Sequence, residues 1–131
     1  MVGEDPLKKL SSLGAVLCAF ALLTVVKPAV AGNYGALATS PDADFGYSYN
    51  YDYAEEARSR ALEECRKHSS DCKIKGNFEN TCVSVAKASN GAMGWAWGHG
   101  RGEDDRMAMS ECRNNRGRSC ELAARFCTGN P

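Results

Sequence analysis

The sequence predicts an α+β fold: a small single domain made of two copies of a ββαβ unit with pseudo-two-fold symmetry, stapled by disulfides. Three observations predict it. A leader-like segment opens the chain, six cysteines follow that segment, and the sequence after the leader repeats itself at an offset of 48 residues.

Residues 1–31 have the pattern of a signal peptide. Lys8 and Lys9 form a basic start, Leu13–Val26 is an apolar run, and Ala29–Ala31 supplies the small residues of a cleavage site. Such a leader is removed during export. The apolar run is also shorter than the roughly 20 residues that a membrane-spanning helix needs.

Cleavage is expected before Gly32, which leaves a mature domain over residues 32–131. The sequence therefore predicts a secreted or periplasmic protein that is not an integral membrane protein once it is cleaved. Two alternatives stay open. Lipidation of Cys18 would anchor the product in a membrane, and an uncleaved leader would do the same.

The charge balance argues against one class of partner. The chain holds 16 Lys plus Arg and 16 Asp plus Glu, and the leader takes three of the first group and two of the second. A nucleic-acid binder of this size usually carries a basic excess, because neutralising phosphates supplies most of its affinity. We therefore expect no nucleic-acid partner.

The mature domain has an even number of cysteines: Cys65, Cys72, Cys82, Cys112, Cys120 and Cys127. In a small exported domain this count is typical of a disulfide framework, although the count alone does not assign the pairs. Metal binding is the alternative, but no two cysteines have the two-residue spacing of a zinc knuckle. We expect three disulfides, no metal and no cofactor.

The internal repeat divides the mature chain into two units, at about 34–81 and 82–127. Three pairs of segments align: Gly35–Ala38 with Val83–Ala86, Phe45–Tyr49 with Met93–Trp97, and, with one residue dropped, Ala61–Arg66 with Ala108–Arg113. Since the matching segments come in the same order, the repeat predicts one supersecondary unit used twice.

In the first unit, a run of small apolar residues predicts a strand over Tyr34–Thr39. Alternation of large and small residues predicts a second strand over Phe45–Tyr51, and turn residues between the two predict a hairpin. Alanines on one stripe of Ala54–His68 predict an amphipathic helix. A short strand is expected over Lys73–Phe78.

The second unit repeats this order. Strands are expected over Cys82–Ala88 and Met93–His99, with the turn chemistry of a hairpin between them. A helix is expected over Glu103–Asn115, where acidic residues in the first turn suit the helix dipole. The last predicted strand is Glu121–Phe126.

The two units also suggest the disulfide pairing. In each unit one cysteine ends the helix and another opens the next strand, and two cysteines outside the repeat remain. The predicted pairs are Cys65–Cys72, Cys112–Cys120 and Cys82–Cys127. In the chain-entropy model the two short loops each contribute about 2–3 kcal/mol to stability and the long loop about 4 kcal/mol.

Five segments carry a likeness to a known family: Tyr34–Ala38, Gly46–Tyr49, Ala61–Cys65, Asp71–Lys73 and Gly94–Trp97. In their order and cysteine spacing they resemble the domain-of-unknown-function 4189 family of exported bacterial proteins. The likeness covers nearly the whole mature chain. The resemblance implies a secreted or periplasmic location, and it implies no catalytic residues, because that family has no established chemistry.

Two aromatic rows are the candidate ligand-binding surface. The alternation predicts that Tyr47, Tyr49 and Tyr51 share one strand face with Phe45, and that Trp95, Trp97 and His99 share the matching face of the later strand with Met93. Such rings can stack on sugars or peptides. The alternative is that both rows are core and pack against the helices. The sequence favours the core, because few aliphatic side chains are available to fill it.

The search for catalytic motifs is negative. Gly98–Gly102 is glycine-rich and precedes a helix, but Glu103 stands where a dinucleotide fingerprint has its third glycine. His68 and His99 are the two histidines of the chain, and the sequence implies no nucleophile near either. We therefore expect no catalytic residues.

The sequence thus predicts an exported, non-enzymatic interaction module. It would engage a protein partner in the periplasm or extracellular space, as an inhibitor, an immunity-type factor or an effector. One alternative is a domain that binds cell-wall glycan through the aromatic rows. A further alternative is a small hydrolase that uses carboxylate catalysis.

Overall fold

The computed structural model describes residues 32–131. The predicted signal peptide, including Cys18, lies outside the described residues. The elements follow in the order β1 (Tyr34–Thr39), β2 (Phe45–Tyr51), α1 (Ala54–Arg66), β3 (Lys73–Glu79), β4 (Thr81–Lys87), β5 (Met93–Trp97), α2 (Arg101–Asn114) and β6 (Glu121–Thr128).

The strands form two antiparallel three-stranded sheets with the orders β2-β1-β3 and β5-β4-β6. The register repeats as well as the order. Leu37 lies opposite Tyr47 in the first sheet, and Val85 lies opposite Trp95 in the second. The predicted α+β class and its duplicated ββαβ arrangement are confirmed.

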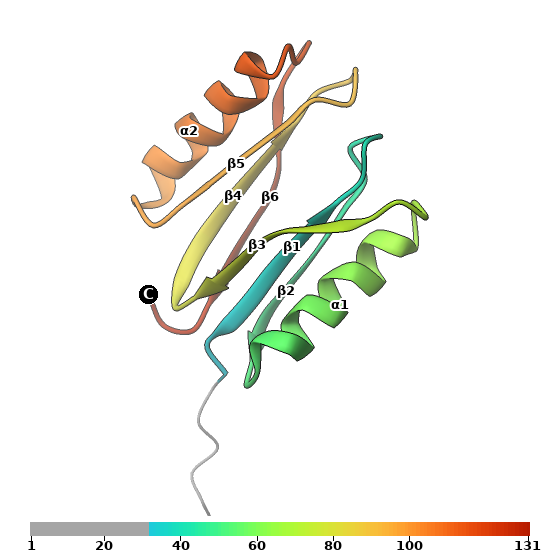
Figure 1. Cartoon of the computed structure of the whole chain (residues 1–131). Helices are drawn as coiled ribbons and strands as arrows, with labels where there is room; N and C mark the ends of the chain where they lie inside the picture. Colours follow the sequence, from blue (N-terminus) through green and yellow to red (C-terminus); the bar gives the residue numbers. More distant parts are fainter. Residues whose placement is uncertain (1–31) are drawn as a thin grey trace, which may run out of the picture.

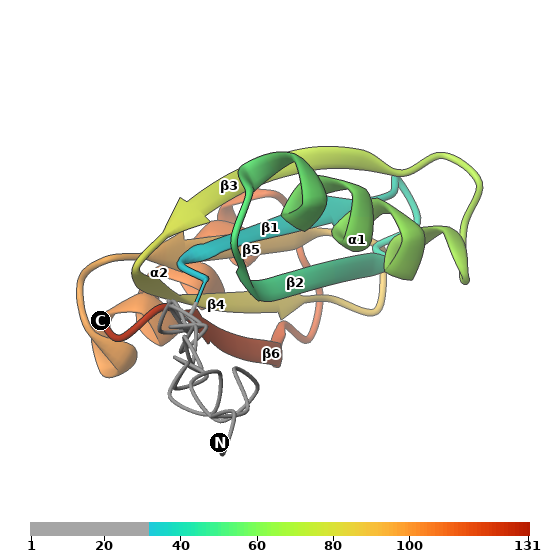
Figure 2. The ribbon, with the colours of Figure 1, turned by 90° about the horizontal axis from the view of Figure 1, so that it is seen from below.

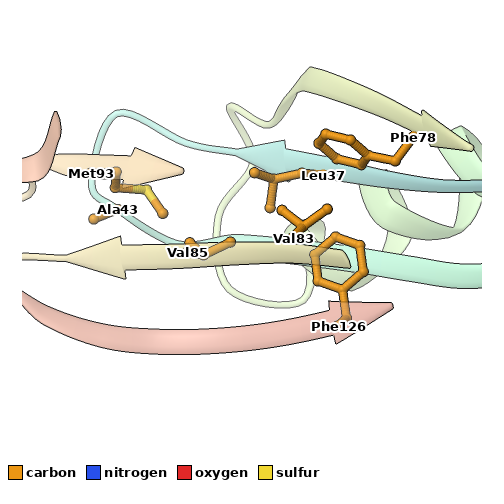
Figure 3. Packing of buried hydrophobic residues seen from close by; sticks show 7 residues of the cluster. All are labelled: Leu37, Ala43, Phe78, Val83, Val85, Met93 and Phe126. Atoms are coloured by element: carbon orange, nitrogen blue, oxygen red, sulfur yellow. The ribbon is translucent and has the colours of Figure 1, made fainter. Parts of the chain in front are cut away.

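The molecule has four layers, with the two sheets packed face to face and one helix on the outer face of each (Figure 1). Figure 2 shows the first sheet with α1 alongside and β6 of the second sheet near β2. The large apolar side chains meet between the sheets (Figure 3): Leu37, Ala43, Phe78, Val83, Val85, Met93 and Phe126.

Small residues line the two helix–sheet interfaces. Under α1 the buried residues are mostly alanines, such as Ala36, Ala57 and Ala61, together with the half-cystine Cys65. This division of sizes corrects one expectation. The rings of Phe45, Tyr47 and Trp95 pack between the sheets and not against the helices, because the helix-facing positions of β2 are taken by small residues such as Gly46.

Three disulfides hold the layers: Cys65–Cys72, Cys112–Cys120 and Cys82–Cys127. The first two each close a loop from a helix to the following strand. The third joins directly opposite residues of β4 and β6. Three disulfides are compatible with an oxidising, exported location. Among residues 32–131, no helix is long and apolar enough to cross a membrane.

Candidate functional site

The two aromatic rows divide between core and surface. Tyr47 and Trp95 are partly buried against the core between the sheets. Tyr49 and Trp97, the next residues in each row, are 51% and 47% exposed. Each row therefore begins in the core between the sheets and ends in solvent.

The row on β2 is a continuous stack. The ring centroids of Phe45 and Tyr47 are 6.4 Å apart, and those of Tyr47 and Tyr49 are 6.3 Å apart. Tyr47 also stacks on Phe126 of β6, with 4.6 Å between centroids. The exposed Tyr49 ring is thus supported from behind by rings that are fixed in the core.

Two residues predicted to belong to the aromatic rows, Tyr51 and His99, do not lie on the same face as the others. A β-bulge between Ser48 and Tyr51 includes Asn50, whose φ is 59°, and it turns Tyr51 to the side of the sheet that carries α1. His99 lies beyond the end of β5, where its ring contacts Asp104. Strict alternation predicted both residues on the aromatic face, and this prediction is wrong because the regular strand ends or bulges before each of them.

The six candidate residues do not form one surface. β2 borders β6, whereas β5 lies beside β3, where Trp97 packs edge-on against Phe78 at 5.4 Å. Since β2 and β3 are opposite edges of one sheet, the tyrosines and the tryptophans lie on opposite sides of the sandwich. Any ligand contacts one set or the other.

The free edge of β5 is closed by two side chains, one from α2 and one from the residue that follows it. The Glu111 carboxylate accepts a hydrogen bond from the backbone N–H of Trp95 at 3.0 Å. The Asn115 amide donates to the backbone C=O of Met93 at 2.8 Å. Edge strands expose unpaired backbone groups that attract other strands, so these two contacts protect the edge.

The equivalent edge of β2 is open. Because Leu37–Tyr47 has the same register as Val85–Trp95, the N–H of Tyr47 and the C=O of Phe45 point away from β1. The residues equivalent to the two caps are Glu64 and His68. In the described part of the chain, no side chain hydrogen-bonds these two backbone groups.

Glu64 is held away from the edge by its own helix. Its Oε1 lies 2.5 Å from Nη2 of Arg60 and 2.8 Å from Nζ of Lys67. The hydrogen bond from Lys67 lowers the pKa of Glu64, aided by the charge of Arg60 and opposed by desolvation. The charge of Glu64 in turn raises the pKa of Arg60. Both groups stay ionised, so the pair persists.

A cavity of about 460 Å³ wraps around the open edge. Its lining residues come from β2 and from one side of α1: Phe45, Gly46, Tyr47, Ser48, Tyr49, Tyr51, Arg60, Glu64 and His68. One wall is aromatic and the other is charged. Unpaired backbone groups lie between them, which is the arrangement that an added strand requires.

Sequence reasoning pointed to the tyrosines but missed the open edge. A signal for it exists in the internal alignment. Arg60, Lys67 and His68 align with Met107, Asn114 and Asn115. Arg60 and Lys67 form ion pairs with Glu64, whereas the uncharged Met107 and Asn114 cannot form such pairs with the equivalent Glu111. Only the structure shows that the acidic residue common to both helices reaches the strand edge in the second unit alone.

Comparison with known proteins places most of the chain in a family. The model of a family described as a domain of unknown function, DUF4189, matches residues 34–127. No curated protein and no solved structure matches the chain.

Proposed function

Because this chain belongs to the DUF4189 family, whose description assigns no activity, we propose a function from its own geometry: it is an exported interaction module that binds an extended segment of a protein partner along the open edge of β2. The observation that carries this proposal is the difference between the two edges. β5 has its outward N–H and C=O groups capped, and β2 does not.

Strand addition uses the backbone for affinity and the alternate side chains for specificity. A segment paired with Phe45 and Tyr47 would send every second side chain toward the stacked rings. The side chains between them would face Arg60 and Glu64 on α1. The favoured partner segment therefore alternates apolar or aromatic residues with polar ones.

The scaffold suits such a role. Three disulfides and two helices hold the sheets, so β2 is ordered before a partner arrives. A pre-ordered edge reduces the conformational entropy that binding costs. Export by the predicted signal peptide, with a partner in the periplasm or outside the cell, is part of the same proposal.

The first test gives the first unit the residues that, in the second unit, allow side chains to hydrogen-bond the strand edge. The variant Arg60→Met, Lys67→Asn, His68→Asn gives α1 the residues of α2. This frees Glu64 to accept from the Tyr47 N–H, and it lets the new side-chain amide donate to the Phe45 carbonyl. Peptides selected from a displayed library on the unmodified protein would be measured by calorimetry. We expect the transplant to weaken binding at least ~10-fold, the equivalent of about 1.4 kcal/mol.

The matched control makes the reverse exchange on α2: Met107→Arg, Asn114→Lys, Asn115→His. It alters the same number of surface residues but leaves β2 untouched, so peptide binding should be retained. Amide hydrogen exchange adds a direct readout, since a bound peptide should protect the N–H of Tyr47. Equal peptide affinity for the transplant and the unmodified protein would contradict docking at this edge.

A glycan is the second candidate ligand, and the exposed Tyr49 ring favours it. Half of this side chain is in solvent, and it stacks on Tyr47, as a sugar platform requires. The same variants separate the two functions. Stacking of a wall fragment would survive the cap transplant and would be lost in Tyr49→Ala.

A further inference from the structure

The two units differ at a place where a side chain of one reaches the other. Lys87 of β4 lies over the Phe45 ring of the first unit, with Nζ 5.9 Å from the ring centroid. The internal alignment puts Thr39 at the position of Lys87, and Met93 at the position of Phe45. Threonine is too short to fill the space that the lysine fills. Thr39 and Met93 instead line a cavity of about 300 Å³.

Two lysines of β3 line the same cavity. Lys73 lies directly opposite Thr39 on β1, and Lys75 is the extra residue of a β-bulge in β3. The equivalent positions of β6 hold Glu121 and Ala123, so the second unit has no cation at either. Within residues 32–131, neither lysine forms an ion pair. Both ammonium groups are therefore free to bind an anion.

Thr39 adds a hydroxyl that has no protein partner. The residue is only 5% exposed, and nothing in the described part of the chain hydrogen-bonds its side chain. Buried hydroxyls are normally hydrogen-bonded. Since no fully buried polar side-chain atom of the described residues lacks a partner, this oxygen must reach the solvent of the cavity that Thr39 lines. A ligand in the cavity can therefore hydrogen-bond it.

The second unit supplies a wall that is already fixed. Trp95, partly buried against the core, lines the cavity together with Met93 and Asn115. The Trp95 N–H is held by Glu111 at 3.0 Å, and the Met93 carbonyl by the Asn115 amide at 2.8 Å. The contacts that protect the edge of β5 thus also hold this wall in place. A site formed in advance lowers the conformational entropy that binding costs.

We propose that this cavity binds a small acidic sugar. The ammonium groups of Lys73 and Lys75 suit the carboxylate of such a ligand. The Asp71 carboxylate, which also lines the cavity, and the Thr39 hydroxyl can accept hydrogen bonds from sugar hydroxyls. The Trp95 ring suits the apolar face of the sugar ring. An acidic sugar offers all three features in one molecule.

The volume and the place of the cavity narrow the proposal. About 300 Å³ is the lower end for small-molecule sites, which fits a single sugar ring better than a chain. The cavity lies between β3 and β5, on the side of the sandwich opposite the open edge of β2. This proposal and the proposed function can therefore fail independently.

The test titrates the full-length chain, with its disulfides formed, with glucuronate and with glucose, which lacks the carboxylate. Two-dimensional NMR resolves the indole N–H signals of the two tryptophans. Glucuronate should shift the Trp95 signal more than that of Trp97, which does not line the cavity. We expect it to bind at least ~10-fold more tightly than glucose, as loss of a charge-assisted hydrogen bond implies. Added salt should weaken this binding.

Two variants change the charge in opposite directions. Thr39→Lys gives the first unit the residue of the second and fills the cavity, so affinity should fall at least ~10-fold although a cation is added. Lys75→Gln removes an exposed cation and should weaken binding at least ~5-fold. Lys87→Gln is the matched control, because it removes the same charge outside the cavity and should keep the affinity.

Several results would overturn the proposal: equal affinity for glucuronate and glucose, inorganic phosphate binding as tightly as glucuronate, or full affinity in Lys75→Gln. Unchanged or higher affinity in Thr39→Lys would indicate unspecific attraction and would overturn it as well. If Thr39→Lys does not fold, Lys75→Gln decides, since its side chain lies at the surface. Tyr49→Ala and the triple variant of α1 should bind glucuronate normally, which separates this site from the β2 edge.

Discussion

Gly46 and Gly94 let each helix lie directly on its sheet. A Cβ added at Gly46 would come within 2.3 Å of the Cys65 nitrogen, and one at Gly94 within 2.2 Å of the Ala108 carbonyl oxygen. These are backbone atoms, so no side-chain rotation relieves the overlap. The helix itself would have to move, and with it the disulfide at Cys65 or Cys112.

Gly46→Ala and Gly94→Ala should each lower the free energy of unfolding by about 1–3 kcal/mol or more, the usual cost of overpacking. Urea titration followed by tryptophan fluorescence measures this. Gly102→Ala is the control, because a Cβ there meets nothing within 4 Å and alanine is the better helix former. Similar stabilities for all three variants would show that the helices are not seated on these glycines.

At the scale of elements, Asp105 joins α2 to two strands of its sheet. Its carboxylate accepts from the Ser84 hydroxyl on β4 at 2.7 Å and from Nε of Arg125 on β6 at 2.8 Å. The hydrogen bond from Arg125 is the main cause of a lowered pKa for Asp105; Ser84 adds to it and burial opposes it. The ionised carboxylate is therefore favoured in the folded state.

This lowered pKa gives a direction for pH dependence. Because the folded-state pKa of Asp105 lies below its ordinary value of 3.8, its contribution is complete above that value and is lost as the pH falls through the folded-state pKa. Asp105→Asn should thus be less stable than the unmodified protein at neutral pH, and the difference should shrink in acid. Urea titrations at several pH values test this, and a difference independent of pH would contradict it.

The sequence predicted the strands and helices better than it predicted the contacts between them. A run of small apolar residues placed β1 at its observed bounds, Tyr34–Thr39, and alternation placed β2 at Phe45–Tyr51. Alternation could not show the bulge at Asn50, because that residue takes a positive φ that strand periodicity does not encode. The bulge is why Tyr51 lies on the α1 side of its sheet.

The open edge of β2 could not be predicted from the sequence, for a different reason. Glu64 and Glu111 are the same residue type at the same place in two similar helices. The Glu64 carboxylate pairs with Arg60 and Lys67, whereas the Glu111 carboxylate accepts a hydrogen bond from the backbone N–H of Trp95. This difference depends on distances between a helix and a strand edge, and therefore on the packed layers.

At the scale of the molecule, the large apolar side chains of the two units form one shared layer. The helix–sheet interfaces are built from alanines and cystines, whereas the larger apolar side chains lie between the sheets. Leu37 and Phe78 of the first unit meet Val83, Val85 and Phe126 of the second (Figure 3). Separating the units would expose this shared layer, so the fold should be lost as a whole.

The chain carries its own probes for this cooperativity, because all five tyrosines lie in the first unit and both tryptophans in the second. Tyrosine second-derivative absorbance and tryptophan fluorescence should give the same urea midpoint. Leu37→Ala in the first unit should remove about 2–5 kcal/mol and shift the tryptophan midpoint as far as the tyrosine midpoint. If only the tyrosine signal moves, the units fold independently, and the β2 edge would then belong to a unit that is stable without its neighbour.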